Sequence, residues 1–234
     1  MSLANLHAWT ASPDEAIKIQ AELRDRLVLS WDGREVRTVG AVDVGLEEKQ
    51  ARASAVALRY PDLTPLEGAT VEAPFSFPYI PGLLAFREGP AVVAAWEKLR
   101  TKPDLIMFDA QGIAHPRGIG LASHMGLWFE RPSIGVAKSR LYGRHADPGP
   151  NRGDTAQLWD EHDPDCIVGM VVRTQTDVSP VYVSIGHLID LAHAVEFVLK
   201  CSTRYRLPEP SRWARKVARG ERLPTELSDQ AELF

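Results

Sequence analysis

The chain has 234 residues, a mass of 25.9 kDa, 44% hydrophobic and 25% charged residues, and a formal net charge of −4. This size and balance are typical of a single globular domain, which we expect to span 1–234. No apolar stretch approaches the roughly 20 residues of a membrane span, and two cysteines exclude a disulfide framework or a cysteine metal cluster.

Residues 1–5 lack the charged and apolar regions of a secretory signal peptide, so a cytoplasmic location is expected. Two unpaired thiols, Cys166 and Cys201, fit that reducing compartment.

The amino-terminal third predicts an outer helix followed by three strands. Apolar residues recur at helical spacing over 12–30, and Ser12 before Pro13 suits an N-cap followed by the first helical position. A proline-rich segment at 74–81 then interrupts regular structure. The three strands are expected at 38–44, 52–60 and 69–73.

The rest of the pattern alternates helices and strands. Two strands are expected at 105–108 and 133–137, and a polar loop at 145–165 precedes a small hairpin of 167–173 and 181–185. Helices are expected at 84–100, 119–128, 188–199 and 211–219.

Three antiparallel strands followed by parallel crossovers predict an α/β fold with a mixed five-stranded sheet and helices on both faces. The small hairpin and the carboxy-terminal helices would be additions to this sheet. With the first strand beside the fourth, this layout resembles the ribonuclease H-like fold.

Two predicted strands end in an aspartate, Asp43 and Asp109, and a third apolar run ends in Lys138. Ligands bind at such strand ends in α/β sheets. Together with Glu88, these side chains predict a site for Mg²⁺ and a phosphodiester, because Mg²⁺ prefers oxygen ligands. A lone acid is more often a helix cap or surface charge, but both aspartates with the lysine favour the site.

Two further segments point to a nucleic-acid base. Prolines stiffen the loop Pro78-Tyr79-Ile80-Pro81-Gly82, whose exposed tip could enter the gap left by an everted nucleotide. The alternative is a turn that packs Tyr79 into the core. After Asp109, glycines at 112, 118 and 120 allow the backbone to cradle a base oxygen or a phosphate.

Local charge also favours nucleic acid despite the negative net charge. Residues 200–222 hold eight Lys and Arg against two Glu, and residues 111–144 hold five against one. This basic footprint fits contact with phosphates, and a solvated helix face is the alternative.

These segments together resemble the endonuclease V family over about 38–218. The resemblance rests on Val42-Asp43-Val44-Gly45, the Tyr79 loop with Phe86-Arg87-Glu88, Gln111–Arg117, Gly135-Val136-Ala137-Lys138-Ser139 and Arg206-Leu207-Pro208-Glu209-Pro210. It implies a Mg²⁺-dependent hydrolase of nucleic-acid repair that cuts the second phosphodiester 3′ to a hypoxanthine base, leaving a 3′-hydroxyl and a 5′-phosphate.

The resemblance also assigns roles. Asp43, Glu88 and Asp109 match the metal-binding acids, Lys138 matches the catalytic lysine, and Tyr79 matches the residue that fills the gap in the strand. The implied substrate-binding residues are Tyr79, Ile80, Pro81, Gly82, Gly112, His115, Arg117, Gly120, Leu121, Ala122 and Ser139. The expected partner is DNA containing deoxyinosine, bound by a monomer, with inosine-containing RNA as a second substrate and Mn²⁺ as an alternative ion.

Two residues depart from the family pattern. Ala110 stands where glycine is usual, and Arg215 stands where the family usually has Asp or His near the metal. A cation at Arg215 leaves open whether one or two metal ions act. Two alternatives therefore stand beside the nuclease: a module of the same fold that binds inosine without cutting, and a structure-specific nuclease for flaps or junctions.

Overall fold

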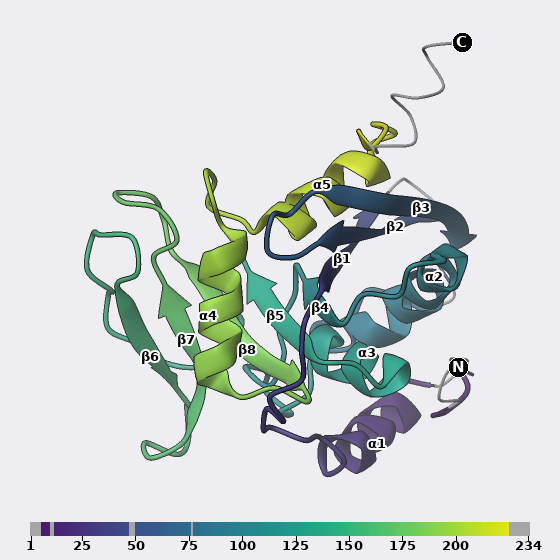
Figure 1. Ribbon diagram of the computed structural model, residues 1–234. Coiled ribbons are helices and arrows are strands. Elements are labelled where there is room, and N and C mark those ends of the chain that lie inside the picture. The colour runs from purple at the N-terminus through teal and green to yellow at the C-terminus, as the bar shows by residue number, and fades with distance from the viewer. Residues whose placement is uncertain (1–5, 10–11, 47–49, 76, 225–234) are drawn as a thin grey trace.

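A computed structural model of the chain describes residues 6–9, 12–46, 50–75 and 77–224. Its strands form one mixed eight-stranded sheet in the order β3-β2-β1-β4-β5-β8-β7-β6 (Figure 1). The strands are β1 (Thr38–Leu46), β2 (Gln50–Arg59), β3 (Pro65–Pro74), β4 (Leu105–Phe108), β5 (Ser133–Ala137), β6 (Thr155–Trp159), β7 (Ile167–Val172) and β8 (Val181–His187). The helices are α1 (Pro13–Arg24), α2 (Leu84–Lys98), α3 (Leu121–Phe129), α4 (Leu191–Cys201) and α5 (Glu209–Ala218).

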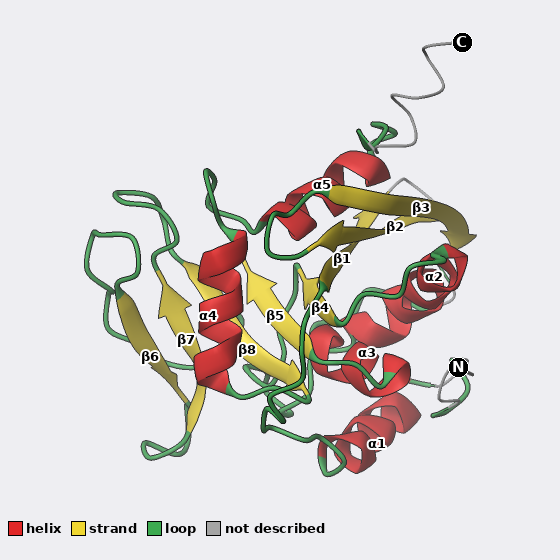
Figure 2. Cartoon of the chain, viewed as in Figure 1, coloured by secondary structure: helices red, strands yellow, loops and turns green. Residues whose placement is uncertain are grey.

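Helices cover both faces of the sheet, as predicted (Figure 2). On one face, α4 and α5 close a core that includes Ala41, Met107 and Val136. On the other face, α2 and α3 pack against Ile106 and Phe108. Because successive strand residues point to opposite faces, each buried strand supplies both cores. The mixed α/β architecture is therefore confirmed.

The pairing of β1 with β4 places two acids side by side. The strands are parallel, with Val39 opposite Leu105 and Val42 opposite Phe108. Asp43 is the next residue of β1 and Asp109 directly follows β4, so the register brings both residues to the same point of the sheet edge. The first strand lies beside the fourth, as the ribonuclease H-like layout requires.

Beyond shifts of a few residues at element ends, four features of the predicted fold differ from the structure. The first helix ends at Arg24 rather than continuing to 30, because the chain caps at Asp25 and leaves for β1. The third strand runs from Pro65 to Pro74 and is twice the expected length, since it pairs along most of β2.

The remaining two differences change the sheet itself. Residues 155–159, predicted as part of a polar loop, form the edge strand β6, in which Leu158 alone is buried. An edge strand needs apolar contact on one side only, so its hydrophobic signal is weak. The hairpin of β7 and β8 pairs with β5 and joins the main sheet, which therefore has eight strands rather than five.

None of the helices in the described part of the chain is long and apolar enough to cross a membrane. Residues 1–5, for which the sequence predicts no signal peptide, lie outside the described residues.

Candidate active site

A cavity of about 370 Å³ opens at the edge where β1, β4 and β5 end. Four elements supply its acids and its lysine: Asp43 comes from β1, Glu88 from α2, and Asp109 and Lys138 follow β4 and β5. Arg215 and Arg219 enter from α5, on the opposite side from α2. The four residues predicted from the sequence to form the catalytic centre therefore line one pocket, which we call the acid pocket.

Burial and nearby negative charge disfavour the ionised forms of Asp43 and Glu88. The pKa of Asp43 is raised, first by burial and then by the nearby charge of Asp109. Burial, with a smaller contribution from Asp43, raises the pKa of Glu88 to about 8. Lys138 donates a hydrogen bond from Nζ to Oδ2 of Asp109 and compensates that carboxylate locally. Perturbed acids gathered in a cleft are a physical mark of a functional site.

The side chains of the acid pocket are of the kind that bind a hard divalent ion, although they are not already placed in a complete coordination geometry. Carboxylate oxygens are the ligands that Mg²⁺ prefers, and a bound cation would favour the ionised forms that burial, and to a smaller extent repulsion, disfavour. Within the described chain, no three His, Cys, Asp or Glu side chains are already grouped to coordinate one ion. Mg²⁺ commonly uses only one or two carboxylates and keeps its waters, so Asp43 and Glu88 could hold it while Asp109 stays bonded to Lys138.

A second cavity, of about 390 Å³, lies directly beside the first. The two share a wall made of Leu84, Asp109, Leu121 and Lys138. This volume is within the range of roughly 300–1,000 Å³ found for small-molecule sites, so a nucleobase can be accommodated. We call this second cavity the base pocket.

The loop that carries Tyr79 forms the rim of the base pocket. The Tyr79 side chain is 69% exposed, which excludes the alternative of a turn that packs it into the core. An exposed large aromatic side chain beside a cavity is available to stack on a base.

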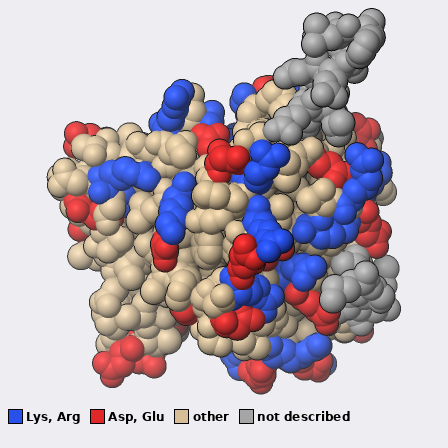
Figure 3. All heavy atoms as spheres, in the orientation of Figure 1, with Lys and Arg blue, Asp and Glu red and all other residues tan. Residues whose placement is uncertain are grey.

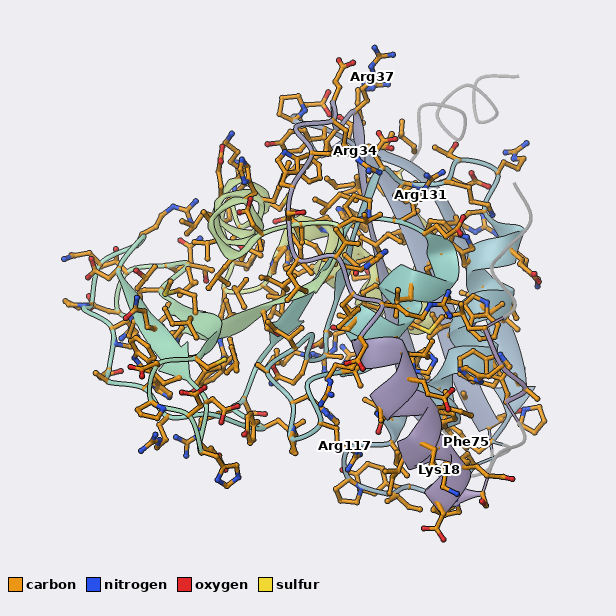
Figure 4. The ribbon with its side chains drawn as sticks, turned by 90° about the horizontal axis from the view of Figure 1, so that it is seen from below. Lys18, Arg34, Arg37, Phe75, Arg117 and Arg131 are labelled. Carbon is orange, nitrogen blue, oxygen red and sulfur yellow. The ribbon has the colours of Figure 1, made fainter. Side chains whose placement is uncertain are left out.

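Three side chains hold this loop by one oxygen. The carbonyl of Gly82 accepts hydrogen bonds from Gln20 Nε2 at 2.9 Å, His115 Nε2 at 3.0 Å and an Arg117 guanidinium nitrogen at 2.6 Å. Gln20 also accepts from Arg117 Nε at 2.5 Å, and Figure 4 shows Arg117 beside α1, the helix that carries Gln20. Gly82 itself has φ +80°, a conformation that favours glycine. The helix α1 therefore anchors the Tyr79 loop.

His115 is a neutral part of this anchor. Burial, and secondarily the charge of Arg117, lowers its pKa to about 4. Its Nδ1 accepts from the backbone N–H of Arg117 at 3.1 Å, while Nε2 faces Gly82. Both ring nitrogens are thus occupied by structural contacts.

The glycine-rich segment lies against the base pocket, which Gln111 and Gly120 line. The N–H of Gly112 donates to Ser184 Oγ at 2.8 Å, and its carbonyl accepts from the N–H of Gly120 at 2.8 Å. A Cβ on Gly112 would collide with the carbonyl oxygen of Ile185. Glycine is required here for close approach of two backbones.

The predicted substrate-binding residues divide into two groups. Eight line the base pocket: Tyr79, Ile80, Pro81, Gly82, His115, Gly120, Leu121 and Ser139. Gly112, Arg117 and Ala122 lie outside its lining. Sequence reasoning missed Gln20 and Leu141, which also line it, as does Gln111 from the motif that carries the family resemblance. Gln20 is buried on a helix far away in the sequence, and nothing in its local pattern indicates this contact.

The predicted basic footprint is not a continuous patch on the face that displays α4 and α5. Figure 3 shows Lys and Arg interspersed there with Asp and Glu. Two of the cations are neutralised locally: Arg212 pairs with Glu209 at 2.8 Å and Lys216 with Glu221 at 3.4 Å.

Comparison with known proteins gives a consistent result. The model of the family described as Endonuclease V matches residues 21–216. Endonuclease V of Trichormus variabilis is 46% identical over 221 residues, covering 93% of this chain and 99% of that protein. The crystal structure of endonuclease V from Streptomyces avermitilis superimposes with a TM-score of 0.86 at 42% identity, covering 91% of this chain and 94% of the other.

A relative bound to nucleic acid also superimposes. Endonuclease V of Ciona intestinalis, in complex with a 23mer DNA containing an inosine followed by a ribo-adenosine, has a TM-score of 0.76 at 26% identity. The superposition covers 90% of this chain and 99% of that chain.

Proposed function

This chain belongs to the endonuclease V family, and on that premise we propose that it is a Mg²⁺-dependent endonuclease directed at deoxyinosine. Its substrate is a nucleic-acid strand containing hypoxanthine, and it hydrolyses the second phosphodiester on the 3′ side of that base. Inosine-containing RNA is a second candidate substrate, since an inosine flanked by a ribonucleotide occupies the Ciona intestinalis complex.

One observation carries the proposal: the acid pocket and the base pocket share a wall of four residues. A nucleotide turned out of its stack into the base pocket leaves its strand running across the carboxylates next door. Enzymes that modify a base inside a duplex evert it in this way, and we infer the same movement for reading hypoxanthine here. The base that is recognised and the phosphodiester that is cut would then lie a fixed distance apart on one strand. This fits a cut that is displaced from the hypoxanthine base.

Two segments would perform recognition. Tyr79, at the exposed tip of its loop, would fill the gap in the stack, as apolar side chains do in other proteins that unstack bases. The backbone around Gln111 and Gly120 would face the edge of the base. Because Gln20, His115 and Arg117 all bond Gly82, the tip and the pocket are held in one geometry.

The acid pocket would perform hydrolysis. A bound divalent ion would polarise the phosphate and lower the pKa of a water molecule. Asp43 and Glu88 would hold the ion, and Lys138 would place its charge against the phosphate. The water oxygen bonds to phosphorus while the bond from phosphorus to the 3′ oxygen breaks. That oxygen takes up a proton to become the 3′-hydroxyl, the water gives one up, and the other strand end keeps the 5′-phosphate.

The decisive experiment compares matched duplexes that carry deoxyinosine or adenine at one position, with Mg²⁺ or with EDTA. We expect nicking only of the deoxyinosine strand with Mg²⁺, and loss of nicking in Asp43→Ala with binding retained. Binding to inosine without nicking by the wild-type protein would support the binding module instead. Equal cutting of an undamaged branched duplex would support the structure-specific nuclease.

A further inference from the structure

Helix α5 divides its cations between two environments. Arg212 and Lys216 each pair with an acid and lie over an aromatic ring, with Arg212 stacked 3.3 Å from the centre of Tyr205. Arg215 and Arg219 instead line the acid pocket. Among the described residues, neither of these two guanidinium groups has a hydrogen-bond or ion-pair partner.

Their spacing makes the two arginines a pair. They are four residues apart at the carboxy-terminal end of α5, so they lie one above the other on the same face of the helix. Arg215 is partly buried and Arg219 is exposed. The pair therefore extends from inside the pocket to its mouth, along a line that a strand could follow.

When all of its side chains are ionised, the acid pocket carries no net charge before an ion is added. Its three carboxylates face three cations, namely Lys138, Arg215 and Arg219. Both arginines are close enough to Asp43 to favour its ionised form. One divalent ion would give the pocket two surplus positive charges, and a second would give four. A polyanionic strand can neutralise the first surplus with two phosphates, whereas two ions would repel each other and the arginines.

We propose that Arg215 and Arg219 form a phosphate clamp for the strand at the scissile position, and that this clamp takes the place of a second divalent ion. The inference rests on the proposed function. Guanidinium groups suit this role, because they stay charged and bind phosphate oxygens through two parallel hydrogen bonds. In two-metal nucleases the second ion stabilises the charge on the leaving oxygen; here a fixed cation on α5 does so beside a single ion.

The first test is the salt dependence of binding, measured in EDTA so that no strand is cut. Each phosphate contact contributes about 0.9 to the slope of log affinity against log salt concentration on duplex DNA. Arg215→Ala and Arg219→Ala should each reduce that slope by about this amount, on deoxyinosine and undamaged duplexes alike. Lys216→Ala removes the same charge from the next position of the same helix and should leave the slope unchanged.

The second test counts bound metal. Titration with Mn²⁺, followed by electron paramagnetic resonance of the free ion, should give one bound ion per wild-type chain. Arg215→Asp removes a cation and adds a carboxylate, and should admit a second ion. Arg215→Lys keeps the charge but loses the paired hydrogen bonds, so it should keep the salt slope while kcat falls about tenfold or more.

An unchanged slope in both arginine variants, or two ions bound by the wild-type chain, would overturn the clamp. A different result would contradict the proposed function: with Mg²⁺, the wild-type protein would cut deoxyinosine and undamaged duplexes equally or not at all, whatever the salt dependence of its binding. Circular dichroism and thermal unfolding of each variant distinguish lost contacts from lost folding.

Discussion

The substitution Glu88→Gln tests whether the acid pocket stores unfavourable charge that a metal relieves. Glu88 lies on α2 with its pKa raised to about 8, against 4.5 for an ordinary glutamate. Between those pH values the folded protein holds a proton that the unfolded chain releases. The raised pKa of Glu88 therefore costs nothing below about pH 4.5, and the free energy of unfolding falls progressively as the pH rises toward 8.

The magnitude follows from the same pKa values. One pH unit corresponds to about 1.4 kcal/mol, so the interval from 4.5 to about 8 corresponds to about 5 kcal/mol as a ceiling. Water reaches this partly buried side chain and screens its charge. We expect the free energy of unfolding at pH 8 to be about 2 kcal/mol higher in Glu88→Gln than in the wild type, because glutamine keeps the shape of the side chain and removes its charge.

Urea denaturation in EDTA at several pH values between 5 and 8 measures this difference. The wild-type free energy of unfolding should fall below that of Glu88→Gln as the pH rises, and the two should converge at pH 5. Glu97→Gln changes an exposed acid on the same helix and should follow the wild type. Adding Mg²⁺ should stabilise the wild type and not Glu88→Gln. Parallel curves for wild type and Glu88→Gln would show that Glu88 is not strained by burial and by Asp43.

Four other changes probe the base pocket and the core. Tyr79→Ala removes an exposed side chain and should leave thermal stability unchanged, while nicking of a deoxyinosine duplex falls at least tenfold; equal nicking would deny it a role in base eversion. Gln20→Ala leaves Arg117 Nε without its acceptor and removes one of the three donors to the Gly82 carbonyl. It should cost about 1–3 kcal/mol in urea denaturation and weaken discrimination against adenine in a nicking assay. Gly112→Ala places a methyl group against backbone and should cost about 1–3 kcal/mol or more, seen as a lower Tm; an unchanged Tm would contradict the tight packing. Burial lowers the pKa of His124 to about 3. Because the unfolded chain takes up a proton that the folded protein does not, this buried histidine destabilises the fold as the pH falls from about 6.5 toward 3. In that pH range His124→Leu should flatten the pH dependence of the free energy of unfolding by up to about 1.4 kcal/mol per pH unit.

The sequence by itself predicted which residues gather in the acid pocket to a large extent. Asp43 and Asp109 each end an apolar run, and parallel pairing of those runs makes them neighbours whatever the surrounding helices do. Tyr79 lies between prolines that limit how its loop can bend, so its exposure was one of two definite alternatives. Both inferences rest on local pattern, which the hydrophobic effect and backbone stereochemistry control directly.

Only the tertiary structure decided which distant residues complete the two pockets. Gln20 reaches the Tyr79 loop because α1 packs beside α3, and Arg219 lines the acid pocket because α5 lies across β1 and β2. The joining of β6, β7 and β8 to the main sheet was likewise not visible, since an edge strand with one buried residue carries little pattern. Such placements depend on how whole elements pack, and packing energy is spread over many contacts with no marker at any single position.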